Sequence, residues 1–181
     1  YPIPAHANSV WYTLGGMTFL GFVVLILTGV YLTFFFDPSV NEVVYQGSYE
    51  FSKHFYPLIH DLREKRADGT PAEEFVCARA IDAHPAVKHW VRNVEREERF
   101  SFWLPTATDY FYPDFVAELN DGRVLVVEYK GAHLLHDPDT REKDQIGQQW
   151  AASSGGKCLF LMAVADDSGR DVAAQIAGKI G

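Results

Sequence analysis

All 16 Lys and Arg residues lie after position 50, and this asymmetry divides the chain into two unlike parts. No side chain from Ala7 to Phe36 is charged, whereas the rest of the chain holds all 24 acidic residues. A charge-free stretch and a charge-rich stretch bury different kinds of surface, so we expect them to fold as separate units. The charged part is net acidic, because all but three of the acidic residues follow position 50. It is therefore no general polyanion binder, and contact with DNA would need a local basic face, a bound cation or a partner.

The first part contains an apolar run, Val10–Phe36, that is longer than the roughly 20 residues a bilayer requires. Trp11, Tyr12 and Tyr31 lie toward its ends, as aromatic residues do at membrane interfaces. A signal peptide would need a basic start and a shorter apolar run. A buried helix of a soluble domain would be shorter and less uniformly apolar. The run therefore predicts one transmembrane helix, with the membrane contact through about residues 10–36.

The first basic cluster follows this run and consists of Lys53, Arg63, Lys65 and Arg66. The positive-inside rule would keep residues that follow the helix in the cytoplasm. The expected organisation is a single-pass membrane protein with a cytoplasmic C-terminal domain. Its parts are a helix segment over residues 1–42, a linker or junction over 43–52, and a domain over 53–181.

Alternating helix and strand patterns fill the second part of the chain. A helix is expected over residues 71–84, with Thr70 as its N-cap and Pro71 at its first position. Hydrophobic patterning and turn residues then predict strands over 87–95, 114–119, 123–131 and 157–165, and helices over 140–154 and 171–181. This αβββαβα order predicts an α/β sandwich on a mixed sheet.

The most informative segment is PDFVAELNDGRVLVVEYK, residues 113–130. Asn120–Gly122 predicts a hairpin turn, which brings Asp114 across from the end of the next strand. Glu128 and Lys130 are two positions apart on that strand and so point to the same face, while Tyr129 points to the other. Two carboxylates and an ammonium group are therefore expected to converge.

That group of side chains has the chemistry of metal-dependent phosphodiester hydrolysis. Asp114 and Glu128 would hold one or two Mg²⁺ ions, and the backbone carbonyl of Tyr129 would add an oxygen ligand. Lys130 would orient the attacking water or stabilise the transition state. As a bare pattern, these residues also occur as solvated charges on ordinary hairpins. Here Glu128 and Lys130 end a very apolar strand, where charges are rare without a partner or a function.

Several longer stretches carry a family resemblance: KHFYP, EEFVCARAIDAHPAVKHWVRNVE, FSFWLPTATDYFYPDF, LNDGRVLVVEYKGAH and GGKCLFLMAVADDSGRDV. Through them, residues 53–181 resemble the C-terminal PD-(D/E)xK endonuclease domain of the Res subunit of type III restriction enzymes. The resemblance implies an αβββαβ restriction-endonuclease-like fold and Mg²⁺-dependent cleavage of double-stranded DNA, with Asp114, Glu128 and Lys130 as the motif residues. It also implies a helicase and a methyltransferase subunit as partners in trans. The chain has no G-x-x-x-x-G-K-[ST] loop, so ATP dependence and sequence recognition do not carry over.

The same fold family has an acidic residue on its first helix. Glu74 is the best match, because it shares a helical stripe with Ala78 and Ile81. Glu73 is the alternative, and either could instead be a solvated first-turn glutamate.

Further basic and polar residues are candidates for contact with DNA. Lys143 and Gln148 lie on the expected helix over 140–154, where they would reach a phosphate or form an ordinary polar face. A second group would form either a phosphate-contacting patch or, with the glutamates among them, a mixed-charge surface; its members are Lys88, Arg92, Arg96 and Arg99.

The stretches PIPAHANSVWYTLGG and LTGVYLTFFFDPS also carry a resemblance. Over about residues 1–45 the chain resembles the first membrane helix of bacterial cytochrome b proteins. The haem-ligating helices of that family have no counterpart here, and His6 precedes the helix, so no haem is expected. The leading hypothesis is thus a Mg²⁺-dependent DNA endonuclease. The alternative is a catalytically idle, membrane-anchored chimera with only a binding or packing role, and a recombined or mis-assembled reading frame is a third explanation.

Overall fold

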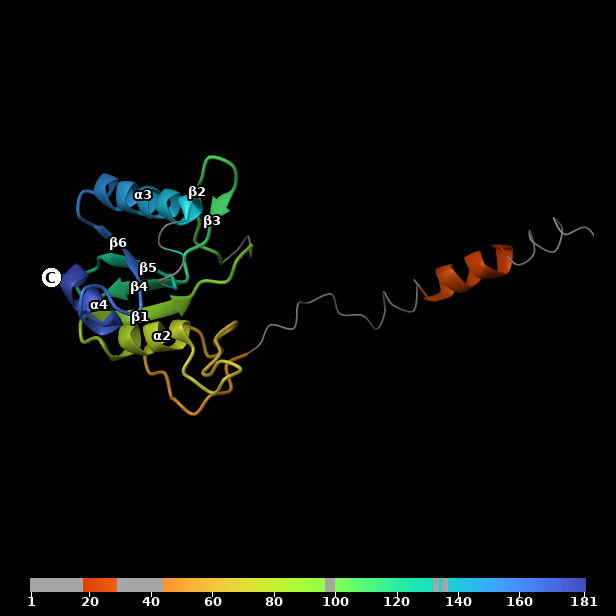
Figure 1. The fold of residues 1–181 in the computed structure, drawn as a ribbon, viewed down its shortest axis with the longest axis horizontal. Coiled ribbons are helices and arrows are strands. Elements are labelled where there is room, and N and C mark those ends of the chain that lie inside the picture. Colours follow the sequence, from red (N-terminus) through yellow and green to blue (C-terminus); the bar gives the residue numbers. More distant parts are fainter. Residues whose placement is uncertain (1–17, 29–43, 97–99, 132–133, 135–136) are drawn as a thin grey trace, which may run out of the picture. The chain divides into compact units, whose positions relative to one another are not determined.

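The chain divides into two units, Tyr1–Asn41 and Glu42–Gly181 (Figure 1). The structure is a computed structural model that describes residues 18–28, 44–96, 100–131, 134 and 137–181.

In the first unit, residues 18–28 form a helix. Within the described ranges, no helix is long and apolar enough to cross a membrane. On this finding, the prediction of a single-pass membrane protein with a cytoplasmic C-terminal domain is wrong. The rest of the expected span, residues 10–17 and 29–36, lies outside the described residues.

The second unit is built on a four-stranded sheet with the strand order β1-β4-β5-β6. The first three strands in this order are antiparallel neighbours: β1 (Val87–Arg92), β4 (Phe115–Leu119) and β5 (Val124–Tyr129). The fourth, β6 (Cys158–Ala163), pairs with β5 in parallel. The mixed sheet predicted from the sequence is confirmed.

Helices cover both faces of this sheet (Figure 1). Helices α2 (Glu73–Ala83) and α4 (Val172–Ile180) lie on one face, and α3 (Pro138–Ser153) lies on the other. A two-stranded sheet of β2 (Leu104–Pro105) and β3 (Tyr110–Phe111) lies beside α3. No strand is predicted there from the sequence. Apart from this small sheet, the second unit has the α/β layered arrangement expected from the sequence.

Side chains of β5 alternate between the two faces of the sheet. Leu125, Val127 and Tyr129 belong to the core that contains residues of α2 and α4, whereas Val126 packs with Phe160 in the core beneath α3. Because side chains two positions apart share a face, Glu128 follows Val126 on the α3 side. The alternation predicted for this strand is confirmed.

The start of α2 differs from the prediction. The helix begins at Glu73, with Ala72 at the N-cap position and no side-chain capping bond. Thr70 instead donates its amide and its hydroxyl to Asp68 Oδ1, over 2.9 and 2.6 Å. The prediction of Thr70 as the cap was wrong because the Asp68 carboxylate closes a turn just before the helix.

Residues expected to form a linker pack onto the folded unit. Tyr45, Tyr49 and Phe51 lie against the main core, and the ring of Phe51 meets that of Trp90 edge-on at 5.2 Å. Asp82, a buried carboxylate of α2, accepts hydrogen bonds from the amides of the two residues after Phe51 and from the Trp90 indole. The expected linker over 43–52 is therefore corrected: its aromatic residues extend the core.

Candidate active site

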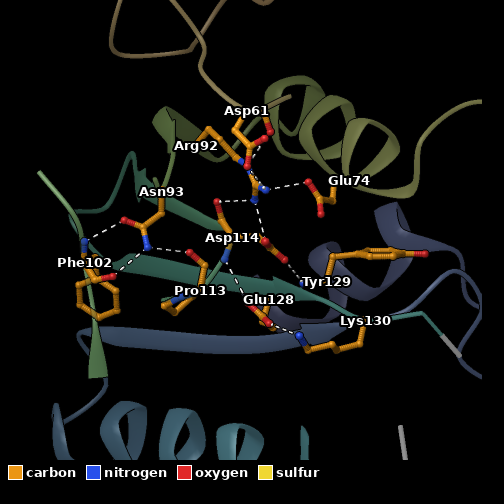
Figure 2. Close-up of polar contacts among 10 residues, drawn as sticks. All are labelled: Asp61, Glu74, Arg92, Asn93, Phe102, Pro113, Asp114, Glu128, Tyr129 and Lys130. Carbon is orange, nitrogen blue, oxygen red and sulfur yellow. Dashed lines mark hydrogen bonds and ion pairs between the residues drawn. The ribbon is translucent and has the colours of Figure 1, made fainter. Parts of the chain in front are cut away.

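The β4–β5 hairpin brings the two predicted carboxylates together (Figure 2). Asp114 directly precedes β4, and its amide donates to Glu128 Oε2 over 3.2 Å. In return, Asp114 Oδ2 accepts the amide hydrogen of Tyr129 over 2.7 Å. The tight turn at Asp121–Gly122, where Gly122 has a φ of 87°, sets this register.

Lys130 completes the group. Its Nζ lies 2.6 Å from Glu128 Oε1, and the two side chains are 20% and 5% exposed. Burial and the nearby Asp114 carboxylate raise the pKa of Glu128 to about 7, against the opposing effect of Lys130. Burial alone would lower the pKa of Lys130, but the charges of Glu128 and Asp114 outweigh it and raise that pKa. Lys130 is therefore a charged ammonium group at neutral pH.

Arg92 is a member of the site that the sequence does not assign. Its guanidinium donates to Asp114 Oδ1 and to Glu74 Oε2, each over 2.7 Å, and its side chain is only 7% exposed. These carboxylates outweigh the effect of burial and raise the pKa of Arg92. Arg92 thus belongs to no surface patch, which corrects that expectation. Strand periodicity is the signal that could have found it, because Arg92 lies two positions after the fully buried Trp90.

The other members of the expected basic patch lie elsewhere. Lys88 forms an exposed ion pair with Glu118 at 2.9 Å, and Arg96 is exposed. Arg99 lies outside the described residues.

Helix α2 places Glu74 at the rim of the site, with 45% of its side chain exposed. Burial raises the pKa of Glu74, and Arg92 opposes that shift. Glu73, the alternative, forms an ion pair with Arg66 at 2.6 Å instead. Of the two glutamates, Glu74 is the one that joins Asp114 through a shared arginine.

Lys143 and Gln148, the two residues predicted to contact DNA, have different surroundings. Lys143 of α3 is near enough to Glu128 for its charge to lower the pKa of that carboxyl, although a nearer partner, Asp139, lies 2.7 Å from its Nζ. Gln148 lies more than one helical turn beyond Lys143 on α3. Its side chain donates a hydrogen bond to Asp144 and accepts one from Lys179. The structure therefore brings Lys143, but not Gln148, toward the carboxylates.

Asn93 is a second residue that sequence reasoning misses. Its buried side chain donates to the carbonyls of Pro113 and Phe102, over 2.7 and 2.8 Å, and accepts the amide of Phe102 over 2.8 Å. It therefore ties the segment before Asp114 to the loop that follows β1 (Figure 2).

Asp114 and Glu128 have donor atoms that suit Mg²⁺, which proteins often bind through one or two carboxylates while it keeps several waters. Each of their four oxygens already accepts one hydrogen bond or ion pair, and each has a further lone pair. Across the described part of the chain, no group of three or more His, Cys, Asp or Glu side chains is placed to hold a metal. A metal here would thus depend on these two carboxylates, on main-chain oxygen such as that of Tyr129, and on water.

Comparison with known proteins finds similarity over about a quarter of the chain. The chain is 55% identical over 46 residues to the cytochrome b subunit of the cytochrome bc1 complex of Corynebacterium efficiens, which covers 25% of this chain and 8% of that protein. It is 54% identical over 47 residues to the same subunit of Mycobacterium tuberculosis, with coverages of 26% and 8%. Cytochrome b6 of Heliobacterium modesticaldum is 44% identical over 39 residues, with coverages of 22% and 18%.

These matches confirm a cytochrome b-like segment in the chain. The chain spans less than a fifth of the length of each of these relatives. No protein-family model matches the chain. The resemblance of residues 53–181 to restriction endonucleases stays a prediction.

Proposed function

We propose that the unit containing residues 53–181 is a metal-dependent endodeoxyribonuclease of the PD-(D/E)xK type. The observation that carries this proposal is the contact between the three motif residues. The backbone amide of Asp114 donates a hydrogen bond to the carboxylate of Glu128, and Lys130 Nζ lies 2.6 Å from Glu128 Oε1. Two carboxylates can hold a metal ion and a nearby ammonium group can stabilise negative charge on a phosphate, so these residues have the chemistry of metal-assisted phosphodiester hydrolysis.

The arrangement of elements supports the same assignment. When the small β2–β3 sheet between β1 and β4 is set aside, helix α2, strands β1, β4 and β5, helix α3 and strand β6 have the αβββαβ order expected for this nuclease fold. The motif residues lie at the start of β4 and the end of β5, the two central strands. A functional cluster on rigid central strands is held more firmly than one on loops.

Each side chain has a role that follows from its place. Asp114 and Glu128, with the main-chain oxygen of Tyr129, would hold one or two Mg²⁺ ions, which when bound lower the pKa of water and neutralise charge on a phosphate. Lys130 is a charged ammonium group next to Glu128 and stabilises negative charge that builds up on the phosphate oxygens. Glu74 fixes Arg92 at the rim of the site.

Double-stranded DNA is the proposed substrate. The net charge of the chain is −8, so its own long-range field repels a polyanion. Lys130 and Lys143 supply local positive charge on the α3 side. Binding strength and sequence recognition would come from a helicase and a methyltransferase subunit acting in trans.

Nicking of supercoiled plasmid in Mg²⁺ tests the proposal. Asp114→Asn, Glu128→Gln and Lys130→Met should each lower the cleavage rate by at least about a hundredfold, because each removes a charged group from the site. Glu118→Gln is the matched control, since Glu118 is a half-exposed carboxylate of the same hairpin. A chelator should abolish cleavage by the wild type. Wild-type rates in any of the three site variants would refute the assignment.

The second candidate is an idle nuclease-like unit, without haem, that only binds or packs. One observation favours it: Lys130 and Arg92 already compensate Glu128 and Asp114, which leaves the carboxylates balanced without a metal. It predicts no Mg²⁺-dependent nicking by the wild type and no Mn²⁺ binding by the purified chain.

A further inference from the structure

The end of strand β1 holds Asp114 at two places. Arg92 Nη1 donates to Asp114 Oδ1 over 2.7 Å and to the Asp114 carbonyl over 3.1 Å. The Asn93 amide donates to the same carbonyl over 2.9 Å, and the Asn93 side chain donates to the carbonyl of Pro113. Both the carboxylate and the backbone of Asp114 are thus fixed from one strand end (Figure 2).

The Arg92 guanidinium is itself held on several sides. It donates to Glu74 as well as to Asp114, and its central carbon lies 5.0 Å from the centre of the Phe115 ring. The side chain is 7% exposed. A planar guanidinium can bridge two carboxylates in a set geometry, whereas the single nitrogen of a lysine cannot reproduce that fork.

The other side of the Asp114 carboxylate faces the site. While Oδ1 is held by Arg92, Oδ2 accepts the amide hydrogen of Tyr129, the residue between Glu128 and Lys130. Any rotation of the Asp114 side chain therefore breaks a contact to β1 or a contact to β5. Arg92 of β1 therefore limits the orientation in which the Asp114 carboxylate faces the residues of β5.

We infer that Arg92, supported by Asn93, is a positioning residue that sets the orientation of the Asp114 carboxylate across the β1–β4–β5 strand ends. The inference has a consequence for catalysis, which rests on the proposed function: a misplaced Asp114 binds Mg²⁺ less well. Its structural part concerns only Arg92, Asp114 and Tyr129, and can be tested without DNA or metal.

A buried ion pair can also serve stability alone. In that case, loss of Arg92 would lower stability and speed hydrogen exchange throughout the sheet. The Tyr129 amide separates the two roles, because its acceptor is the carboxylate that Arg92 holds. The Leu125 amide of the same strand reports the stability of the sheet.

The experiment is hydrogen exchange by NMR on the full chain without metal, comparing wild type, Arg92→Gln and Arg92→Lys. Relative to Leu125, the Tyr129 amide should exchange on the order of tenfold faster in Arg92→Gln, because a hydrogen bond to a charged acceptor is weakened. Arg92→Lys, which keeps the charge, should show a smaller increase. Lys88→Gln on the same strand should show none. If Arg92→Gln does not fold, Arg92→Lys decides: an unchanged ratio of Tyr129 to Leu125 exchange in the folded variant overturns the inference.

A second measurement addresses the catalytic consequence. In plasmid nicking, Arg92→Lys should raise the Mg²⁺ concentration for half-maximal rate by on the order of tenfold, and Lys88→Gln should leave it unchanged. An active Arg92→Lys variant with unchanged Mg²⁺ dependence overturns the inference. If the wild type does not cleave DNA, the proposed function fails, and the Tyr129 exchange ratio still decides whether Arg92 positions Asp114.

Discussion

Glu128 is an ionisable side chain placed where an apolar residue would be more stable. It is 4% exposed, follows three fully buried residues of β5, and lies beside a second carboxylate. Desolvating a carboxylate is unfavourable unless a cation is near, and Lys130 supplies one at 2.6 Å. Such a placement is unfavourable for folding and suited to binding a cation, as the proposed function requires of Glu128.

This placement predicts how stability depends on pH. The pKa of Glu128 is raised from 4.5 to about 7, so between these values the folded chain binds a proton more tightly than the unfolded chain. The contribution of Glu128 to stability is therefore present below pH 4.5 and is lost as the pH rises toward 7. Glu128→Gln should unfold at higher urea concentration than the wild type at pH 8 and differ little from it near pH 4.5.

Urea unfolding at both pH values measures this difference, with Glu118→Gln as the exposed control. Equal midpoints for wild type and Glu128→Gln at pH 8 would show that burial of the charge is not unfavourable. The same substitution should abolish plasmid nicking, so stability and activity would change in opposite directions.

At the scale of elements, the contact between α3 and β6 depends on a glycine. A methyl group built on Gly147 would lie 2.4 Å from the ring of Phe160, and Phe160 is fully buried beneath the helix. The helix can approach the sheet this closely only because the residue has no side chain.

Gly147→Ala should therefore destabilise the fold by about 1–3 kcal/mol, because overpacking outweighs the better helix propensity of alanine. Gly178→Ala is the matched control, since Gly178 lies in α4 with nothing within 4 Å of an added methyl group. It should stabilise the fold by about 0.5–1 kcal/mol. Thermal unfolding of both variants checks the pair, and a neutral or stabilising Gly147→Ala would contradict the close contact.

The elements that the sequence predicts well are those with strong local patterns. The hairpin of β4 and β5 follows from alternating apolar residues around Asn120–Gly122, and that pairing alone brings Asp114 to Glu128. Strand periodicity could mark Arg92 as buried, but not identify its partners, because these come from α2 and from the start of β4, which only the tertiary fold brings together. The predicted Thr70 cap does not form, because the Thr70 hydroxyl donates to the nearby Asp68 carboxylate instead.

At the scale of the whole molecule, the folded unit begins earlier than the sequence predicts. The composition of residues 43–52 is typical of a linker, yet its aromatic side chains join the core. Such side chains were missed because they have neither helix nor strand periodicity, and only packing against Phe75 and Trp90 gives them a place.

Two shortened chains test this boundary. A chain that begins at Glu42 keeps Tyr45, Tyr49 and Phe51, whereas a chain that begins at Lys53 loses all three from the core. The second should unfold at a temperature at least about 5 °C lower than the first, because aromatic burial contributes a few kcal/mol. Equal midpoints would show that these aromatic contacts add nothing to stability.

The order of elements along the chain also has a kinetic consequence. Asp114 and Glu128 lie in one hairpin, whose strands are joined by a short turn, and isolated hairpins close in about 1–10 μs. Glu74 and Arg92 reach Asp114 only when α2 and β1 dock, which are contacts of longer range. We therefore expect the two carboxylates to meet during folding before Arg92, which balances Asp114, has docked. This early repulsion is lost when a carboxylate is protonated. We therefore expect the folding rate, and not only the final stability, to depend on pH.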